Sequence, residues 1–251
     1  MQSSRRIILL LGVVCFCFFG ASRLYAEPKQ IIFYDEYPPF SFQKNGEAQG
    51  LWVDLIEAIL TDMQVPYELQ IYPFKRALHS AKNGDGVVVG VVKNEQRTTF
   101  LDYSEPFYVE KNLLWMRKGH AFKFTNVEDL KGYSLGIKLG WSYGDEFDHA
   151  KEAELFSIID GDTKQLYALL DAKRLDAVVD NDLAAQRLIP KLNLSHELES
   201  LSEPLLLANI YLATQKGRDP EFLAAFNRSL KKLKSSNRLA EIQARFRETM
   251  N

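Results

Sequence analysis

The 251-residue chain is long enough for one large domain or two small ones. Hydrophobic residues make up 46% of it and charged residues 25%, which is typical of a globular protein. The formal net charge of −2 gives no reason to expect nucleic acid or an anionic membrane as a partner.

The first 26 residues differ from the rest. Arg5 and Arg6 precede an apolar run at 7–19, and Ala26 offers a small residue for cleavage. This pattern predicts a cleaved secretory signal peptide over 1–26, with an uncleaved N-terminal anchor as the alternative. The run is shorter than the roughly 20 residues of a membrane span. Both cysteines lie within this segment, so the mature chain is expected to have no disulfide.

After residue 28 the chain alternates between strand and helix periodicity. Strands are expected at 31–34, 67–72 and 87–92, with helices at 51–63 and 75–82. A second series begins near 125, where Thr125 and Glu128 suggest a capping box. It has expected strands at 133–138, 155–159 and 177–179, and expected helices at 142–153, 162–172 and 181–188.

Two apolar runs, 112–116 and 205–213, lie at the seams between the series. We interpret them as strands that cross between two lobes, and we expect two C-terminal helices to pack on the first lobe. The predicted fold is α/β and two-lobed, with two parallel-type sheets joined by two crossing strands. Lobe 1 would span 27–110 and 210–251, lobe 2 would span 111–209, and a ligand cleft would lie between them.

Several segments carry a family resemblance. They lie at 34–40, 50–55, 73–78, 95–108, 140–144 and 174–180. In order and spacing they resemble family 3 of the bacterial periplasmic solute-binding proteins, the polar amino-acid branch with the type II periplasmic-binding fold. The resemblance implies a periplasmic monomer that closes on an amino acid or related carboxylate and serves an ABC-transporter permease. It implies no cofactor, metal or catalysis.

The resemblance also implies two charged ligand contacts. Arg97 precedes the segment 101–108 and would grip the ligand carboxylate, because its planar guanidinium offers two parallel hydrogen bonds. Asp180 follows an apolar strand and would bind the ligand ammonium. The alternatives are a solvated surface arginine and an aspartate that caps the next helix.

Ser142 and the backbone N–H groups of 140–143 are expected to begin a helix, where they could hold the same carboxylate from lobe 2 or act only as a cap. Tyr37 and Phe74 are candidate aromatic walls of the ligand site, with core packing as the alternative. Trp141 is a candidate third wall, whereas Trp52 is expected to be structural.

Three further positions complete the candidate ligand site. Asp35 ends the first strand and could meet the ligand side chain, and Arg76 at a helix start could reach the cleft or only cover apolar surface. Val92 stands where the family often has a hydroxyl residue that helps to bind the ammonium, and Lys93 follows it. This departure leaves open a ligand that is not a simple α-amino acid.

Two other functions stay open from the sequence. The fold resembles that of exported cyclohexadienyl or arogenate dehydratases, for which Glu36, Glu105 and Glu110 are available acids. A ligand sensor that docks to a membrane partner is the second alternative. The four histidines have no metal-ligand spacing.

Overall fold

A computed structural model describes residues 27–248 of the chain. The expected signal peptide at 1–26, with Cys15 and Cys17, lies outside the described residues. None of the described helices is long and apolar enough to cross a membrane.

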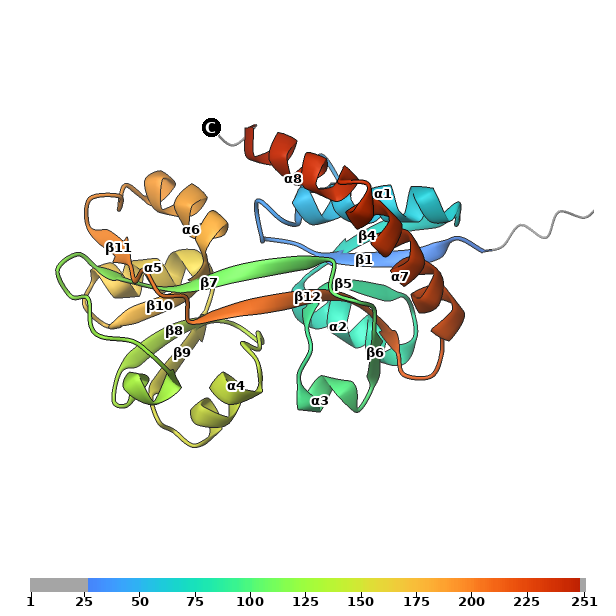
Figure 1. Cartoon of the computed structure of the whole chain (residues 1–251). Coiled ribbons are helices and arrows are strands. Elements are labelled where there is room, and N and C mark those ends of the chain that lie inside the picture. The colour runs from blue at the N-terminus through green and yellow to red at the C-terminus, as the bar shows by residue number, and fades with distance from the viewer. Residues whose placement is uncertain (1–26, 249–251) are drawn as a thin grey trace, which may run out of the picture.

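The first series of elements builds one half of the molecule, shown mainly in blue and cyan in Figure 1. Its elements are β1 (Lys29–Tyr34), β2 (Phe42–Lys44), β3 (Glu47–Gln49), α1 (Leu51–Met63), β4 (Tyr67–Tyr72), α2 (Phe74–Asn83), β5 (Val87–Val92), α3 (Glu95–Thr98) and β6 (Leu101–Tyr103). Two C-terminal helices, α7 (Pro220–Ser235) and α8 (Arg238–Glu248), return to α1 in this half. We call this half the first lobe.

The second lobe follows the long strand β7 (Tyr108–Arg117) and precedes the long strand β12 (Leu206–Gln215). Its strands are β8 (Ser134–Lys138), β9 (Ser157–Gly161), β10 (Ala177–Asn181) and β11 (Leu198–Ser200). Its helices are α4 (Asp145–Glu152), α5 (Thr163–Asp171) and α6 (Asp182–Leu188), with 3₁₀ turns at Val127–Leu130 and Ile189–Leu192. The residue at which each lobe ends stays a prediction.

The two lobes share one hydrogen-bonded sheet in the order β4-β1-β5-β12-β7-β10-β8-β9. β1 pairs in parallel with β4 and β5, and β8 pairs in parallel with β9 and β10. β12 is antiparallel to both β5 and β7, and β7 is antiparallel to β10. The two expected sheets are therefore halves of one continuous sheet, joined by the paired strands β7 and β12 that run between the lobes in Figure 1.

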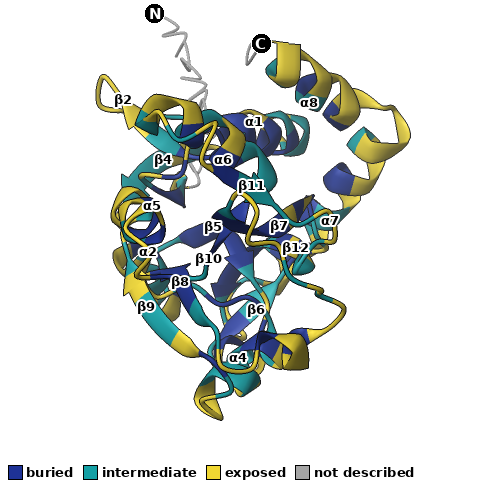
Figure 2. Cartoon of the chain, turned by 90° about the vertical axis from the view of Figure 1, so that its left-hand side faces the viewer, coloured by how far each residue is buried: buried dark blue, intermediate teal, exposed yellow. Residues whose placement is uncertain are grey.

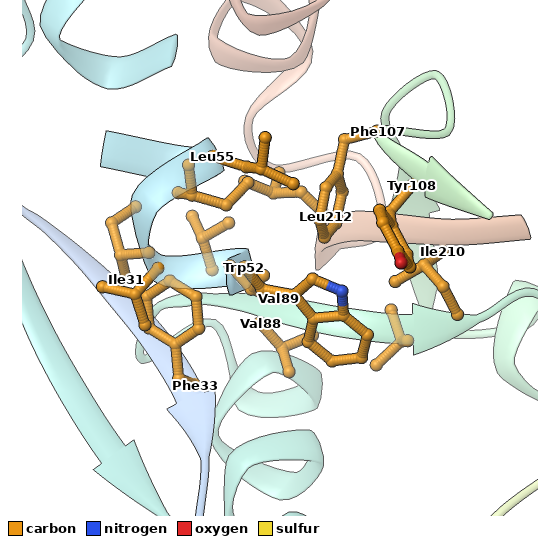
Figure 3. Packing of buried hydrophobic residues seen from close by; sticks show 14 of the residues in the cluster. Ile31, Phe33, Trp52, Leu55, Val88, Val89, Phe107, Tyr108, Ile210 and Leu212 are labelled. Carbon is orange, nitrogen blue, oxygen red and sulfur yellow. The ribbon is translucent and has the colours of Figure 1, made fainter. Parts of the chain in front are cut away.

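The core of the first lobe lies between α1 and the sheet. The β5 sequence VVVGVV is buried at five of its six positions, as expected for a strand covered on both faces. Figure 3 shows Trp52 from α1 packed among Val88, Val89 and neighbouring apolar residues. Gly90 has φ +90°, and a Cβ there would come within 2.3 Å of the Trp52 ring, so this close packing requires glycine.

The second lobe has two core clusters, one on each face of its sheet. Leu114, Leu135 and Phe147 represent the first, and Leu113, Leu166 and Val178 the second. Figure 2 shows this burial: β8 and β10 are mostly dark blue, whereas the edge strand β9 and the outer helix faces carry yellow. The alternation of side chains along β7 explains why Leu113 and Leu114 belong to different clusters.

Two predicted helix caps are wrong in detail. Helix α4 begins at Asp145 after Gly144 and not at Ser142, because the Ser142 hydroxyl bonds to Asp148 instead of capping a first turn. The expected capping box at Thr125 and Glu128 lies one residue later, at Asn126 and Asp129, on a 3₁₀ turn. There the Asp129 carboxylate accepts from the backbone N–H groups of Thr125 and Asn126.

Candidate functional site

The carboxyl ends of four strands meet where the two lobes face each other. Tyr34 ends β1, Val92 ends β5, Lys138 ends β8, and Asp180 is the last residue but one of β10. Loops that leave the carboxyl ends of parallel strands commonly build the ligand sites of α/β proteins. The seam between the lobes is therefore the candidate functional site.

Arg97 lies in this seam and is 5% exposed. One guanidinium nitrogen donates to the Val92 carbonyl of the first lobe at 3.0 Å, and the other to the Gly140 carbonyl of the second lobe at 3.4 Å. The guanidinium also lies 5.5 Å from the centre of the Phe74 ring. Burial lowers the pKa of Arg97 from its usual range, although an arginine stays protonated in proteins.

Four aromatic side chains form a cluster across the seam. Trp141 of the second lobe lies edge-on to Tyr37 at 4.6 Å and to Tyr34 at 5.8 Å between ring centres. Its ring centre is 6.0 Å from that of Phe74. Because Tyr34, Tyr37 and Phe74 all belong to the first lobe, the Trp141 ring joins the two lobes at this point.

A buried ion pair lies beside the aromatic cluster. Lys138 Nζ is 2.7 Å from an Asp180 carboxylate oxygen, and the Asp180 side chain has no exposed surface. The same carboxylate accepts from the backbone N–H of Asn181 at 2.8 Å and from the Tyr167 hydroxyl at 3.2 Å. Asp180 does not cap helix α6, because the Asn181 side chain does so.

Glu110 on β7 is the second buried carboxyl of the site, 2% exposed. Burial raises its pKa to about 7, while a hydrogen bond from the Tyr37 hydroxyl at 2.8 Å and the charge of Lys138 oppose that rise. Burial also raises the pKa of Tyr37 well above its ordinary value. Glu110 is thus poised to hold or release a proton near neutral pH.

Three cavities lie along the seam. A small one of about 10 Å³ is lined by Arg97, Glu110, Val92 and Ser142, and it has room for one water molecule. Two larger ones of about 320 and 350 Å³ share a wall formed by Glu36, Tyr37, Lys138, Asp162 and Thr163. Tyr34, Phe74 and Trp141 line both the small cavity and one large cavity, so they separate Arg97 from the larger space.

Polar contacts close one side of the seam. The Asn94 side-chain amide of the first lobe donates to the Ser142 hydroxyl at 2.9 Å and to the Asp148 carboxylate at 3.3 Å. Its carbonyl oxygen caps α3 by accepting from Arg97 N–H at 2.8 Å. The Glu95 backbone N–H donates to the Asp145 carboxylate at 2.9 Å. Asn94 therefore links the position of Arg97 to contact between the lobes.

Asn94→Ala should loosen this contact. The substitution removes a helix cap and two bonds to the second lobe, each worth about 1 kcal/mol, so we expect a melting temperature lower by about 6–12 °C. A ligand held between the lobes should dissociate roughly tenfold faster in stopped-flow fluorescence. Gln96→Ala is the matched control, because it removes an exposed side chain of the same short helix and keeps the backbone bond from Glu95 to Asp145. Equal dissociation rates in the two variants would contradict this role of Asn94.

The structure brings most of the predicted site residues together. Tyr37, Phe74, Val92, Arg97, Trp141, Ser142 and Asp180 all line cavities of the seam. Asp35 borders a large cavity, but its carboxylate accepts from the backbone N–H groups of Glu36 and Gln43. Arg76 lines none of the three cavities and lies 4.0 Å from the centre of the Tyr72 ring, so its predicted ligand contact is not supported by its position.

Sequence reasoning missed three residues of the site. Tyr34 and Lys138 each end a strand that the sequence did predict, and strand-end position was the signal that singled out Asp180. Asn94 precedes the short helix of Arg97, where an N-cap asparagine could have been recognised. No group of three or more His, Cys, Asp or Glu residues that could hold a metal ion occurs within 27–248.

Comparison with known proteins agrees with this architecture. The chain is 26% identical over 214 residues to the L-cystine-binding protein TcyJ of Escherichia coli K12, covering 84% of this chain and 79% of that one. A probable histidine-binding protein of Campylobacter jejuni is 26% identical over 152 residues, 59% of this chain and 58% of that one.

Solved structures show the same fold. An ancestral arginine-binding protein bound to arginine superposes with a TM-score of 0.72 at 24% identity, covering 88% of this chain and 99% of that one. A histidine kinase sensor domain with similarity to periplasmic binding proteins has a TM-score of 0.75 at 21% identity, covering 88% and 96%. These likenesses confirm the predicted two-lobed α/β fold.

The family model for bacterial extracellular solute-binding proteins, family 3, matches residues 30–249, which cover both lobes except for the first residue of β1. This match confirms the family resemblance read from the sequence, and it favours solute binding over the dehydratase and sensor alternatives. The chain belongs to family 3 of the bacterial extracellular solute-binding proteins and is a binding protein, not an enzyme.

Proposed function

We propose that the mature chain is the exported, periplasmic binding component of an ABC importer and captures a small carboxylate of the amino-acid type. Support comes from the family match and from relatives named for amino-acid binding, such as a putative amino-acid ABC transporter-binding protein, PatH, of Vibrio harveyi, 24% identical over 215 residues. Delivery to a permease, a monomeric state and removal of residues 1–26 belong to this proposal.

The position of Arg97 carries the proposal. A guanidinium has five N–H donors, and Arg97 uses one on each of its two terminal nitrogens for one carbonyl from each lobe. A carboxylate that entered between the lobes could take up the remaining donors through charge-assisted hydrogen bonds. Since one carbonyl partner comes from each lobe, a solute at Arg97 would be enclosed when the lobes meet.

Entry of a solute requires the lobes to separate. The small cavity beside Arg97 holds about 10 Å³, and the Trp141 ring lies between it and the larger space. Separation would withdraw Trp141 from Tyr34, Tyr37 and Phe74, because Trp141 alone of these four residues belongs to the second lobe. The paired strands β7 and β12 are the connections about which the lobes would rotate.

A ligand panel tests this function. Protein collected from the exported fraction, with Glu27 as its expected first residue, would be mixed with the common amino acids and their carboxylate analogues. At 100 times its Kd, a true solute should stabilise the protein by about 2.7 kcal/mol, which raises the melting temperature by roughly 5–10 °C. Absence of any stabilisation at millimolar concentrations across the panel would contradict the proposal.

A further inference from the structure

The ammonium of Lys138 occupies a site built for a cation. Its Nζ lies 2.7 Å from the Asp180 carboxylate, 4.1 Å from the centre of the Tyr37 ring and 4.5 Å from that of Trp141. A carboxylate combined with two aromatic faces is the arrangement that proteins use to bind ammonium groups of ligands. Here the protein supplies the ammonium itself.

Asp180 has little capacity left for a second cation. Its side chain is fully buried, and it already accepts from Lys138, the Asn181 backbone and the Tyr167 hydroxyl. The Lys138 side chain is also mostly buried, with only 10% of its surface exposed. A solute ammonium brought to the same carboxylate would lie close to the Lys138 ammonium, and two like charges in a buried site repel each other.

The buried part of the first lobe offers a solute ammonium little in place of Asp180. Val92 ends β5 at the position where a hydroxyl side chain could have received an ammonium proton, and its own carbonyl accepts from Arg97. Glu110, the buried carboxyl that lines the small cavity, already accepts from the Tyr37 hydroxyl. The two buried carboxylates of the seam, Asp180 and Glu110, are therefore both engaged with groups of the protein.

We propose that Lys138 determines the solute class: its ammonium replaces that of the solute, so the site selects carboxylates that lack an α-amino group. The inference rests on the proposed function, because it assumes that Arg97 holds the solute carboxylate. Lys138 is then a specificity-determining residue, and Asp180 serves to fix its position.

The large cavity next to Lys138 agrees with an anionic solute. Lys164, Arg187 and Lys191 line it together with Lys138, and Arg187 Nε is buried with no hydrogen-bond partner within the described residues. Two further acids lie on this wall: the Asp162 carboxylate accepts from two backbone N–H groups of α5, and Glu36 is exposed. A second carboxylate on the solute would meet positive charge on this side.

The test compares pairs of compounds that differ only in the α-amino group. The pairs are L-glutamate and glutarate, L-arginine and 5-guanidinopentanoate, and L-phenylalanine and 3-phenylpropanoate, each titrated calorimetrically into the wild-type protein. In any pair that binds, the amine-free compound should bind at least about tenfold more tightly than the amino acid. Glutarate should be the tightest of the six, because it offers a second carboxylate to the cavity lined by Lys164 and Arg187.

Variants at the ion pair provide the decisive comparison. Lys138→Met frees Asp180, so the preference should invert, with the amino acid about tenfold tighter than its amine-free partner. Since an unpaired buried carboxylate destabilises a fold, the double variant Lys138→Met/Asp180→Asn removes both charges and should bind both members of a pair within about threefold. Lys44→Met, at an exposed lysine of β2 that lines none of the three cavities, should keep the wild-type preference.

The outcomes separate the inference from the proposed function. If the wild-type protein binds an α-amino acid more tightly than its amine-free partner, the inference is wrong and the proposed function stands. If Lys138→Met/Asp180→Asn folds and keeps the wild-type preference, Lys138 does not set the solute class. If no member of any pair binds, the proposed capture of a small carboxylate fails, and the inference fails with it.

Discussion

Arg97→Ala should weaken solute binding at least about a hundredfold, since two charge-assisted hydrogen bonds to a carboxylate, each worth about 1.5–3 kcal/mol, are lost together. The measurement is calorimetric titration with the carboxylate that binds most tightly to the wild-type protein. The affinity of Arg97→Lys should fall between those of the wild type and Arg97→Ala, because an ammonium keeps the charge and lacks the planar pair of donors.

Two comparisons make this result specific. Arg97 bonds to Val92 of the first lobe and Gly140 of the second, so Arg97→Ala could also disturb the contact between lobes, and a melting curve of each variant separates folding from binding. Arg228→Ala, an exposed arginine of α7, is the charge-matched control and should bind within about twofold of wild type. Wild-type affinity in a folded Arg97→Ala protein would show that the carboxylate is held elsewhere.

Glu110→Gln should remove a large part of the pH dependence of stability. The pKa of Glu110 is about 7 in the folded chain because the carboxyl is buried, against an ordinary value of 4.5. Between these two pH values the folded chain keeps a proton that the unfolded chain has released, so the free energy of unfolding falls as the pH rises through this window. The full effect is about 3 kcal/mol.

Melting curves of wild type and Glu110→Gln at about pH 5 and about pH 8 measure this difference. Wild type should lose roughly 6–12 °C more than the variant on going to the higher pH. The glutamine can still accept from the Tyr37 hydroxyl, which keeps the local contact. Glu105→Gln, at an exposed position, should follow the wild-type profile. If the melting temperatures of wild type and Glu110→Gln change in parallel with pH, the pKa of Glu110 is not raised.

The sequence was sufficient for the order of the longer strands and helices because local periodicity determines it, whereas β2, β3, β6, β11 and α3, of three or four residues each, were not predicted. The helix expected at 51–63 matches α1, and the β-branched run at 87–92 matches β5. The pairing of β7 with β12 could not be read in the same way, since residues 112 and 206 meet only in the folded chain. That pairing turns two expected sheets into one.

The site was predictable in part for a similar reason. Arg97 and Asp180 stand in segments that resemble a known family, and the structure brings both to the seam between the lobes. The ion pair of Lys138 with Asp180 joins neighbouring strands, and the pKa of Glu110 depends on burial by both lobes. Neither the ion pair nor the raised pKa leaves a pattern in the local sequence, because each depends on residues that are distant in the chain.

The two lobes also differ in when their cores can be completed as the chain emerges from its N-terminus. The buried residues of the second lobe's core clusters lie between Leu113 and Leu198, so all of them are present once this stretch has emerged. The cluster of the first lobe extends from Ile31 to Ile242, because β12, α7 and α8 are needed to complete it. The amino-terminal third of the chain must therefore wait for the last helices, and its core stays unfinished until almost the whole chain has emerged.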